Sequence, residues 1–269
     1  MVKKIWDIWG KVILNEQVAK DIYTLKIYCP AISQVIQPGQ FVDISVRTDY
    51  TPLLRRPFSV YRILRQEDCL EFRYKIVGKG TRIMREWKPG SEIKVLGPLG
   101  RGFAVTKEMR AIAVIGRGIG LAPLGALSEY AAQHGIVLTA CLSADSAEVV
   151  DSFEIFGRTA QTIYRQSDDG IFADGTLAID PLAENWLNLQ PDALYVCGSR
   201  RLARQAHKLG RQYHVLSQVS MEQNMGCGVG ACQCCVIDTF TDKEQQAREY
   251  KRVCREGPVF DTWEVVSNG

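Results

Sequence analysis

The stretch Ala111-Ile-Ala-Val-Ile-Gly-Arg-Gly-Ile-Gly-Leu-Ala-Pro123 decides the fold class, and the rest of the chain is arranged around it. Its start is a continuous apolar run, which is typical of a parallel strand buried on both faces. Gly116, Gly118 and Gly120 follow directly and allow a ligand to approach the backbone closely. Pro123 suits the first turn of a helix. The stretch therefore predicts a strand, a glycine-rich turn and a helix, with the three glycines as candidate contacts to a dinucleotide.

The glycine-rich turn also fits a simpler interpretation, a tight strand-to-helix connection without a ligand. Leu121 stands where the third glycine of the G-x-G-x-x-G fingerprint would be. No acidic residue follows about 20 positions on, at the end of the second strand. The turn is therefore not the dinucleotide fingerprint of a Rossmann fold, and the sequence alone leaves both interpretations open.

Apolar runs and helical patterns alternate on the C-terminal side of this turn. Helices are expected at 123–133 and 199–212, and strands at 136–141, 161–164 and 193–197. Strands that alternate with helices indicate a parallel sheet with right-handed crossovers. Residues 105–217 are therefore expected to form an α/β domain.

The N-terminal side of the turn has the pattern of β-structure. Short apolar or alternating runs, separated by turns such as Pro38-Gly39 and Pro89-Gly90, favour a closed or nearly closed β-barrel over residues 1–104. A single helix is expected there, at 81–87.

Two short motifs in the predicted barrel point to an anionic ligand. Arg55-Arg56-Pro57-Phe58-Ser59 supplies arginines, whose fixed fork of donors matches a phosphate. Gly78-Lys-Gly80-Thr81 leads into the expected helix, and amides at the start of a helix attract an anion. Each motif alone is also compatible with surface arginines and an ordinary turn. Together, in a barrel that precedes an α/β domain, they are much more specific.

Residues 218–269 form a short third part that is rich in cysteine. Cys227, Cys232, Cys235 and Cys254 have the spacing Cys-x4-Cys-x2-Cys with a distant fourth cysteine, which is the plant-type order for binding a 2Fe–2S cluster. Structural zinc is the alternative, but zinc sites prefer paired knuckles of closely spaced cysteines. Cys234 is surplus to this set, and its side chain is expected to point away from the cluster or to serve as a rescue ligand. The other cysteines lie in strand-like contexts and are expected to be buried as small apolar residues: Cys29, Cys69, Cys141 and Cys197.

Composition limits the class of protein. The chain has 269 residues, 46% of them hydrophobic and 23% charged, which suits a globular protein of one to three domains. A net charge of +3 is too small to argue for a nucleic-acid groove, and no apolar run is long enough for a transmembrane helix. The nine cysteines come without a recognisable secretory signal, so a cytoplasmic location is expected.

These motifs together resemble the ferredoxin–NADP reductase superfamily and, more closely, the electron-transfer subunits of NAD-dependent, class 1B dihydroorotate dehydrogenases. The resemblance covers nearly the whole chain and is most specific at the four spaced cysteines and residues 250–260. It implies an FAD-binding β-barrel at 1–104, an NAD(P)-binding-like α/β domain at 105–217 and a 2Fe–2S domain at 218–269. The FAD contacts that the resemblance implies are Arg56, Pro57, Phe58, Ser59, Arg73, Tyr74, Lys75, Gly80 and Thr81.

The resemblance also implies a function. FAD exchanges two electrons and the cluster carries one at a time, so the chain would convert between two-electron and one-electron transfer. A partner subunit, a TIM-barrel flavoprotein with FMN, would perform the chemistry on the substrate. No Ser–His–Asp or paired-carboxylate arrangement is visible in the sequence, which agrees with the expectation that this chain carries no catalytic acid or base.

Three departures from the family pattern fall in the predicted nicotinamide domain. Arg117 replaces a small residue, Ser199 replaces proline, and Leu142-Ser143-Ala144 replaces Gly-x-Arg. Residues 167–170 and 197–198 fall where the family has its other nicotinamide loops. Two outcomes are open for Arg117: it holds a phosphate of the dinucleotide and favours NADPH, or it fills the space that the dinucleotide needs. Because three departures fall in one domain, a weakened or re-purposed nicotinamide site is the favoured expectation. Two further classes of protein stay open. One is a stand-alone NAD(P)H:acceptor reductase. The other is a wiring subunit, which only passes electrons within a different redox complex and has no working nicotinamide site.

Overall fold

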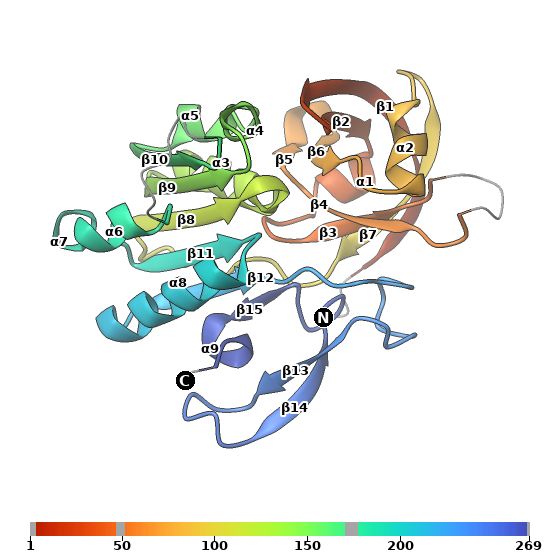
Figure 1. Cartoon of the computed structure of the whole chain (residues 1–269). Helices are drawn as coiled ribbons and strands as arrows, with labels where there is room; N and C mark the ends of the chain where they lie inside the picture. Colours follow the sequence, from red (N-terminus) through yellow and green to blue (C-terminus); the bar gives the residue numbers. More distant parts are fainter. Residues whose placement is uncertain (1–3, 47–51, 170–176, 268–269) are drawn as a thin grey trace.

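The computed structural model describes residues 4–46, 52–169 and 177–267, and these residues form three β-sheets. The first is a seven-stranded antiparallel sheet in the order β4-β3-β7-β1-β2-β6-β5. It curls around its own apolar core and lies at the upper right of Figure 1. Its strands are β1 (Trp6–Ala19), β2 (Ile22–Tyr28), β3 (Phe41–Ile44), β4 (Arg56–Ser59), β5 (Arg62–Leu64), β6 (Cys69–Lys75) and β7 (Glu92–Leu99).

The chain itself joins the two edge strands of this sheet. Val60 and Tyr61 connect β4 to β5. The Val60 N–H donates to the Gln40 carbonyl at 3.4 Å, and the Tyr61 N–H donates to the Glu71 carbonyl at 2.9 Å. The sheet therefore curls until its edges meet at this connection, which agrees with the nearly closed barrel expected from the sequence.

Two short helices belong to the curled sheet, α1 (Pro30–Ser33) and α2 (Lys79–Arg85). Helix α2 begins at Lys79, earlier than the expected residue 81. The Thr81 hydroxyl accepts hydrogen bonds from the N–H groups of Val77 and Gly78 at 3.0 and 3.2 Å. Since these bonds hold Gly78 as the N-cap, the first turn includes Lys79 and Gly80.

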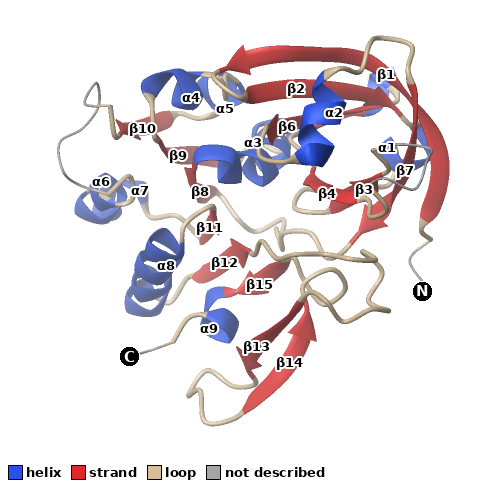
Figure 2. Ribbon diagram, turned by 45° about the vertical axis from the view of Figure 1, so that its right-hand side comes forward, coloured by secondary structure: helices blue, strands red, loops and turns tan. Residues whose placement is uncertain are grey.

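The second sheet has six strands in the order β10-β9-β8-β11-β12-β15 and is parallel except for the last pair. The parallel α/β architecture expected from the sequence is therefore confirmed. Figure 2 shows helices on both sides of the sheet. Its strands are β8 (Ala111–Arg117), β9 (Val137–Ala144), β10 (Thr162–Ser167), β11 (Ala193–Cys197), β12 (Leu216–Ser220) and β15 (Val259–Asp261).

Alternation along β8 explains why both faces of this sheet are covered. Ile112 and Val114 pack with one set of helices, and Ala113 and Ile115 pack with the other. Because successive side chains of a strand point to opposite faces, an apolar run must be buried on both. The first set is α3 (Ala122–Gln133), α4 (Ala147–Asp151) and α5 (Ile155–Thr159); the second is α6 (Asp180–Glu184), α7 (Trp186–Leu189) and α8 (Arg200–Tyr213).

The C-terminal segment occupies the lower part of Figure 1. Its hairpin consists of β13 (Val236–Phe240) and β14 (Arg248–Arg252), and α9 (Thr262–Val265) follows β15. Strand β15 pairs with β12, from Gln218 opposite Asp261 to Ser220 opposite Val259. The C-terminal segment therefore completes the second sheet, and β12 crosses the boundary predicted between residues 217 and 218.

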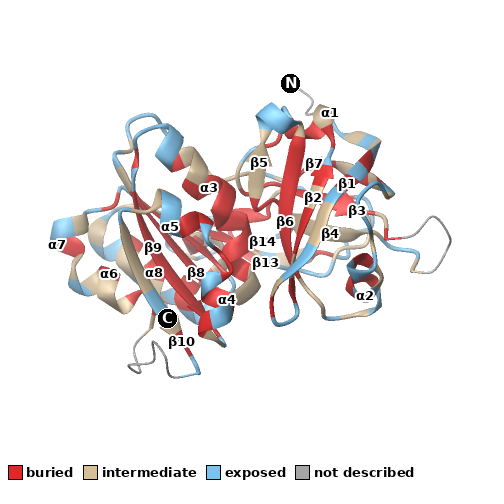
Figure 3. Ribbon diagram, turned by 90° about the horizontal axis from the view of Figure 1, so that it is seen from above, coloured by how far each residue is buried: buried red, intermediate tan, exposed pale blue. Residues whose placement is uncertain are grey.

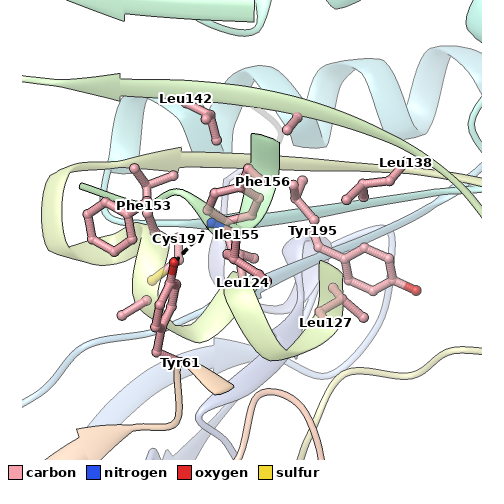
Figure 4. Close-up of a cluster of buried hydrophobic side chains, with 14 of the residues drawn as sticks. Tyr61, Leu124, Leu127, Leu138, Leu142, Phe153, Ile155, Phe156, Tyr195 and Cys197 are labelled. Atoms are coloured by element: carbon pink, nitrogen blue, oxygen red, sulfur yellow. Dashed lines mark hydrogen bonds between the residues drawn. The ribbon is translucent and has the colours of Figure 1, made fainter. Parts of the chain in front are cut away.

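Tyr61 packs the curled sheet against the α/β sheet. Its ring lies among Leu124, Phe153 and other buried side chains of the α/β part (Figure 4), and its hydroxyl accepts the Ile155 N–H at 3.4 Å. A Cβ atom on Gly125 of α3 would lie 2.4 Å from Tyr61 Cδ2, so only glycine fits there. Buried segments of the two sheets face each other along this seam in Figure 3. None of the helices in the described part of the chain is long and apolar enough to span a membrane.

Candidate functional site

The loop before β13 gathers three of the four spaced cysteines. Cys227 Sγ accepts hydrogen bonds from the N–H groups of Ala231 and Cys232 at 3.3 and 3.4 Å. Burial alone would raise the pKa of Cys227, but these N–H groups and that of Val229 outweigh it and lower the pKa to about 6. The loop therefore favours a thiolate at Cys227, which is the form that binds iron.

The distant Cys254 is brought to the same place by the fold. It is buried beside Cys235, whose Sγ accepts the Cys254 N–H at 3.4 Å, and the Gly230 N–H hydrogen-bonds the Cys254 thiol. Burial and the neighbouring Cys235 raise the pKa of Cys254 to about 12. A bound metal reverses such a shift, because coordination deprotonates a thiol.

The four cysteines are arranged as two pairs, Cys227 with Cys232 and Cys235 with Cys254. In the described ranges, no three or more histidine, cysteine, aspartate or glutamate side chains converge on a point where one metal ion would hold them. Four cysteine thiolates at this spacing are the ligand set of a plant-type 2Fe–2S cluster. The donor set therefore fits a 2Fe–2S cluster.

The remaining five cysteines differ in their exposure. Cys234 is exposed and takes no part in either pair. Cys29, Cys141 and Cys197 are buried in the apolar cores of the two larger sheets, as expected, and Cys69 is buried on β6.

Glycines let the cysteine loop pack against the rest of the protein. A Cβ atom on Gly226 would lie 3.1 Å from Cys232 Sγ, and one on Gly230 would lie 2.9 Å from Arg255 Cδ. Gly228 has a φ angle of +68°, and a Cβ there would lie 2.0 Å from Asp43 Oδ2. The loop conformation therefore requires glycine at 228, both for its left-handed backbone and for its contact with the curled sheet.

The two anion-binding motifs of the sequence come together in space. Arg56 lies on β4, and a Cβ atom on Gly80 of α2 would lie 2.8 Å from Arg56 Nε. Arg56 Nη1 donates to the Leu54 carbonyl at 2.6 Å, which holds the guanidinium at the start of α2. A phosphate bound there would meet both the arginine and the helix amides, so this cradle fits the pyrophosphate of FAD.

The predicted segment Arg73-Tyr74-Lys75 lies on β6, where the Tyr74 ring packs edge-on against Phe58 of the flavin motif with ring centroids 6.0 Å apart. Arg73 is buried at the seam, where it donates to Glu71 Oε1 at 2.9 Å and to Glu154 Oε2 at 2.8 Å. The Tyr74 hydroxyl donates to Asn15 Oδ1 at 2.9 Å inside the curled sheet, and Lys75 Nζ lies 3.4 Å from Asp145 Oδ2. The predicted FAD contacts of these three residues stay predictions.

Strand β3 lies between the predicted flavin motif and the buried cysteines. Val42 and Ile44 point into the core of the curled sheet, so Phe41 and Asp43 share its other face. Phe41 packs in one apolar cluster with Cys235 and Cys254. In the pairing with β4, Phe41 lies opposite Ser59, and Asp43 lies opposite Pro57.

Asp43 is a candidate functional residue that the sequence analysis did not identify. A charged residue in a strand of alternating pattern is expected to face solvent, but the side chain of Asp43 is buried. Burial raises the pKa of Asp43 to about 6, and the positive charge of Arg55 opposes this rise. The loop around Gly228, which is distant in sequence, lies against this carboxylate and contributes to its burial.

The glycine-rich turn after β8 is shaped by close packing of two loops. A Cβ atom on Gly120 would lie 2.3 Å from the Cα atom of Gly198, and one on Gly116 would lie 2.5 Å from a methyl group of Leu121. Gly118 has a φ angle of +54°, and nothing lies within 4 Å of the place where its Cβ would be. Two of the predicted dinucleotide contacts thus serve packing, while Gly118 faces open space.

The residues that depart from the family pattern have partners within the protein. Arg117 Nη2 forms an ion pair with Asp168 Oδ2 beside the turn. The Ser143 hydroxyl donates to the Gly116 carbonyl at 3.0 Å, and the Ser199 hydroxyl caps α8 by accepting the Leu202 N–H at 3.3 Å. Gly170, at the end of the predicted loop 167–170, lies outside the described residues.

Comparisons with known proteins agree over nearly the whole chain. Residues 222–266 match the family model of the iron–sulfur cluster binding domain of dihydroorotate dehydrogenase B. The dihydroorotate dehydrogenase B (NAD(+)) electron transfer subunit of Desulforamulus reducens is 33% identical over 267 residues, which cover 98% of this chain and 99% of the relative. The protein with the same description from Bacillus mycoides is 34% identical over 257 residues, covering 95% of this chain and 96% of the relative.

Solved structures share the fold at lower sequence identity. An NADH-dependent reduced ferredoxin–NADP oxidoreductase superposes with a TM-score of 0.76 at 24% identity, covering 95% of this chain and 88% of that chain. A ferredoxin–NADP+ reductase from Plasmodium falciparum superposes with a TM-score of 0.60 at 14% identity, covering 81% of this chain and 97% of that chain. These likenesses support the arrangement of a curled antiparallel sheet beside a parallel α/β sheet.

Proposed function

Because this chain belongs to the family of dihydroorotate dehydrogenase B electron transfer subunits, we propose that it carries FAD and a 2Fe–2S cluster. It passes electrons between a partner dehydrogenase subunit and NAD+ or another acceptor. When bound, FAD takes up two electrons and releases them singly, and the cluster carries one at a time. The chain is an oxidoreductase subunit whose own residues bind and orient these groups.

The cradle of Arg56 and Gly80 supports binding of the FAD pyrophosphate at the start of α2. The rest of the motif, Pro57, Phe58 and Ser59, then orients the flavin along β4, and Thr81 holds the helix start through its hydroxyl. Cys227, Cys232, Cys235 and Cys254 bind the cluster as two pairs. This assignment corresponds to three parts: FAD at 1–104, nicotinamide at 105–217 and the cluster at 218–269.

The observation that carries the proposal is the position of Phe41. Its side chain packs with Cys235 and Cys254, and its backbone lies opposite Ser59 in the pairing of β3 with β4. A single strand therefore separates the predicted flavin motif from two predicted cluster ligands. Such closeness is what electron exchange between the two groups requires.

The partner is an FMN-containing TIM-barrel dehydrogenase subunit, and the complex works in the cytoplasm. The partner performs the chemistry on dihydroorotate or a related substrate. The spaced cysteines and the flavin motif of this chain bind redox groups, and these two motifs supply no acid–base pair for that chemistry.

Co-purification from the native host tests this assignment of the partner. We expect a second flavoprotein with FMN, together with stoichiometric FAD, iron and acid-labile sulfide. A chain that purifies alone as an active NAD(P)H:acceptor reductase would contradict it.

A second candidate, a wiring subunit without a working nicotinamide site, is favoured by one contact. The ion pair of Arg117 with Asp168 lies beside the glycine-rich turn, where a dinucleotide would have to approach. Stopped-flow reduction of the purified protein separates the candidates. Rapid, saturable bleaching of the flavin by micromolar NADH supports the nicotinamide-linked function, and its absence supports the wiring function.

A further inference from the structure

Asp43 and Arg55 leave buried polar atoms without partners at the junction between the flavin motif and the cysteine loop. Within the described ranges, neither Asp43 Oδ1 nor Arg55 Nη1 has a hydrogen-bond partner. Arg55 uses its other terminal nitrogen, Nη2, for Asp7, whose Oδ1 and Oδ2 lie 3.0 and 2.9 Å away. Unpaired buried polar atoms are rare in folded proteins, so this pair requires an explanation.

The fold holds the Asp43 carboxylate against the cysteine loop. Asp43 Oδ2 would lie 2.0 Å from a Cβ atom on Gly228, the residue that follows Cys227. The same face of β3 carries Phe41, which packs with Cys235. The carboxylate is therefore next to the loop of one cysteine pair and on the strand face that contacts the other pair.

Asp43 carries a negative charge at a buried position where a neutral side chain of similar size would also fit. Two carboxylates, Asp43 and Glu71, are buried in the described part of the chain, and Asp43 is 2% exposed. Glu71 is compensated by ion pairs with Arg73 at 2.9 Å and Arg62 at 3.6 Å. Asp43 has the charge of Arg55 nearby but no hydrogen bond to it. An amide or apolar side chain of similar size would avoid the energetic penalty of burying a charge.

We propose that Asp43 sets the reduction potential of the 2Fe–2S cluster, with Arg55 as its partial counter-charge. The inference rests on the cluster assignment of the proposed function. Reduction of the cluster adds one negative charge to it, and the electron comes from the flavin of this chain or from the partner subunit. A fixed negative charge a short distance away, in surroundings of low dielectric constant, opposes this addition and lowers the potential. The Asp43 side chain acts through its field and does not ligate iron.

Asp43→Asn keeps the side-chain size and removes the charge. We expect the midpoint potential of the cluster, followed by EPR during a redox titration of the loaded full chain at pH 8, to shift upwards. Asp7→Asn is the matched control: it removes the same formal charge from another partner of Arg55, but this carboxylate is 44% exposed and better screened by solvent. Its shift should be clearly smaller. An unchanged cluster potential in fully loaded Asp43→Asn protein would overturn the inference.

Arg55→Gln gives an independent test with the opposite sign. Removing the positive charge should shift the cluster potential downwards. Loosening of the cysteine loop would move both variants in the same direction, and that result would also overturn the inference. If Asp43→Asn does not hold the cluster, the Arg55→Gln result decides alone. Iron and acid-labile sulfide are measured in every sample, so wild-type protein without a cluster would refute the proposed function rather than the role of Asp43.

Discussion

Arg252 Nη1 donates a hydrogen bond to the Gly230 carbonyl at 3.0 Å. This bond connects β14, which precedes Cys254, to the loop that carries Cys227 and Cys232. The same guanidinium is oriented by Glu256, which accepts from Nε at 3.0 Å and from Nη2 at 2.7 Å. Two segments that are distant in sequence are thus held together by one planar side chain.

Arg252→Gln should release the cluster several-fold faster than wild type, because glutamine cannot bond Gly230 and Glu256 at the same time. The measurement is the loss of cluster absorbance in the presence of an iron chelator. Arg248→Gln, at an exposed position of the same strand, serves as the control and should behave like wild type. Equal loss rates for both variants would show that the connection through Arg252 does not hold the cluster.

The four predicted cluster ligands should respond alike to substitution. Each of four variants should bleach or destabilise the iron–sulfur absorbance and loosen the C-terminal segment, because metal binding there contributes to folding. These variants are Cys227→Ser, Cys232→Ser, Cys235→Ser and Cys254→Ser. Cys234→Ser should leave the spectrum unchanged, since this exposed side chain belongs to neither pair. Absorbance and EPR spectra check the series. Stoichiometric zinc without acid-labile sulfide in wild-type protein would refute the cluster.

Arg56→Ala should weaken FAD retention by about 10- to 150-fold. The charge-assisted hydrogen bonds to a pyrophosphate that it removes contribute roughly 1.5–3 kcal/mol. Equilibrium dialysis of the flavin measures the change, and Arg85→Ala, an exposed arginine at the other end of α2, is the control. Ser59→Ala should alter flavin reactivity more than retention. Wild-type affinity in Arg56→Ala would mean that the cradle is not the pyrophosphate site.

Arg73→Met should destabilise the fold more than it weakens FAD binding. Its guanidinium joins β6 to the α/β part through Glu154 and the Ser152 carbonyl and also pairs with Glu71 of the same strand, and its side chain is 3% exposed. Breaking such a buried pair costs about 3–5 kcal/mol. Chemical denaturation checks the stability, and flavin affinity of the folded variant checks the alternative. A large loss of FAD affinity at unchanged stability would instead support the flavin contact predicted from the sequence.

NADH and NADPH should reduce the flavin slowly in the isolated chain, and Arg117→Gly should accelerate the reaction. A dinucleotide that approaches Gly118 must displace the ion pair of Arg117 with Asp168, whereas glycine leaves the turn open. Asp168→Asn frees the arginine without removing it, so a faster reaction there would assign the arginine to holding a phosphate. Stopped-flow absorbance provides the rates. A wild-type chain that reacts rapidly with micromolar NADH would contradict the weakened site.

Local patterns in the sequence determined the architecture and the donor sets. The apolar run at 111–115 predicted a strand buried on both faces, and the structure covers it with helices on both sides. The cysteine spacing predicted which thiols form the ligand set, and the fold brings Cys254 beside Cys235. These features depend on residues that are close together along the chain, so period and spacing suffice to predict them.

Tertiary structure alone decided what lies between the two predicted redox groups. Asp43 has the pattern of an exposed strand residue until the loop around Gly228, far away in sequence, covers it. Arg73 is itself a predicted flavin contact, yet the α/β part meets its guanidinium with Ser152 and Glu154. Burial and charge compensation depend on which distant segments pack together. The sequence therefore determined which groups the chain can bind, and long-range packing determined the electrostatic surroundings in which they are held.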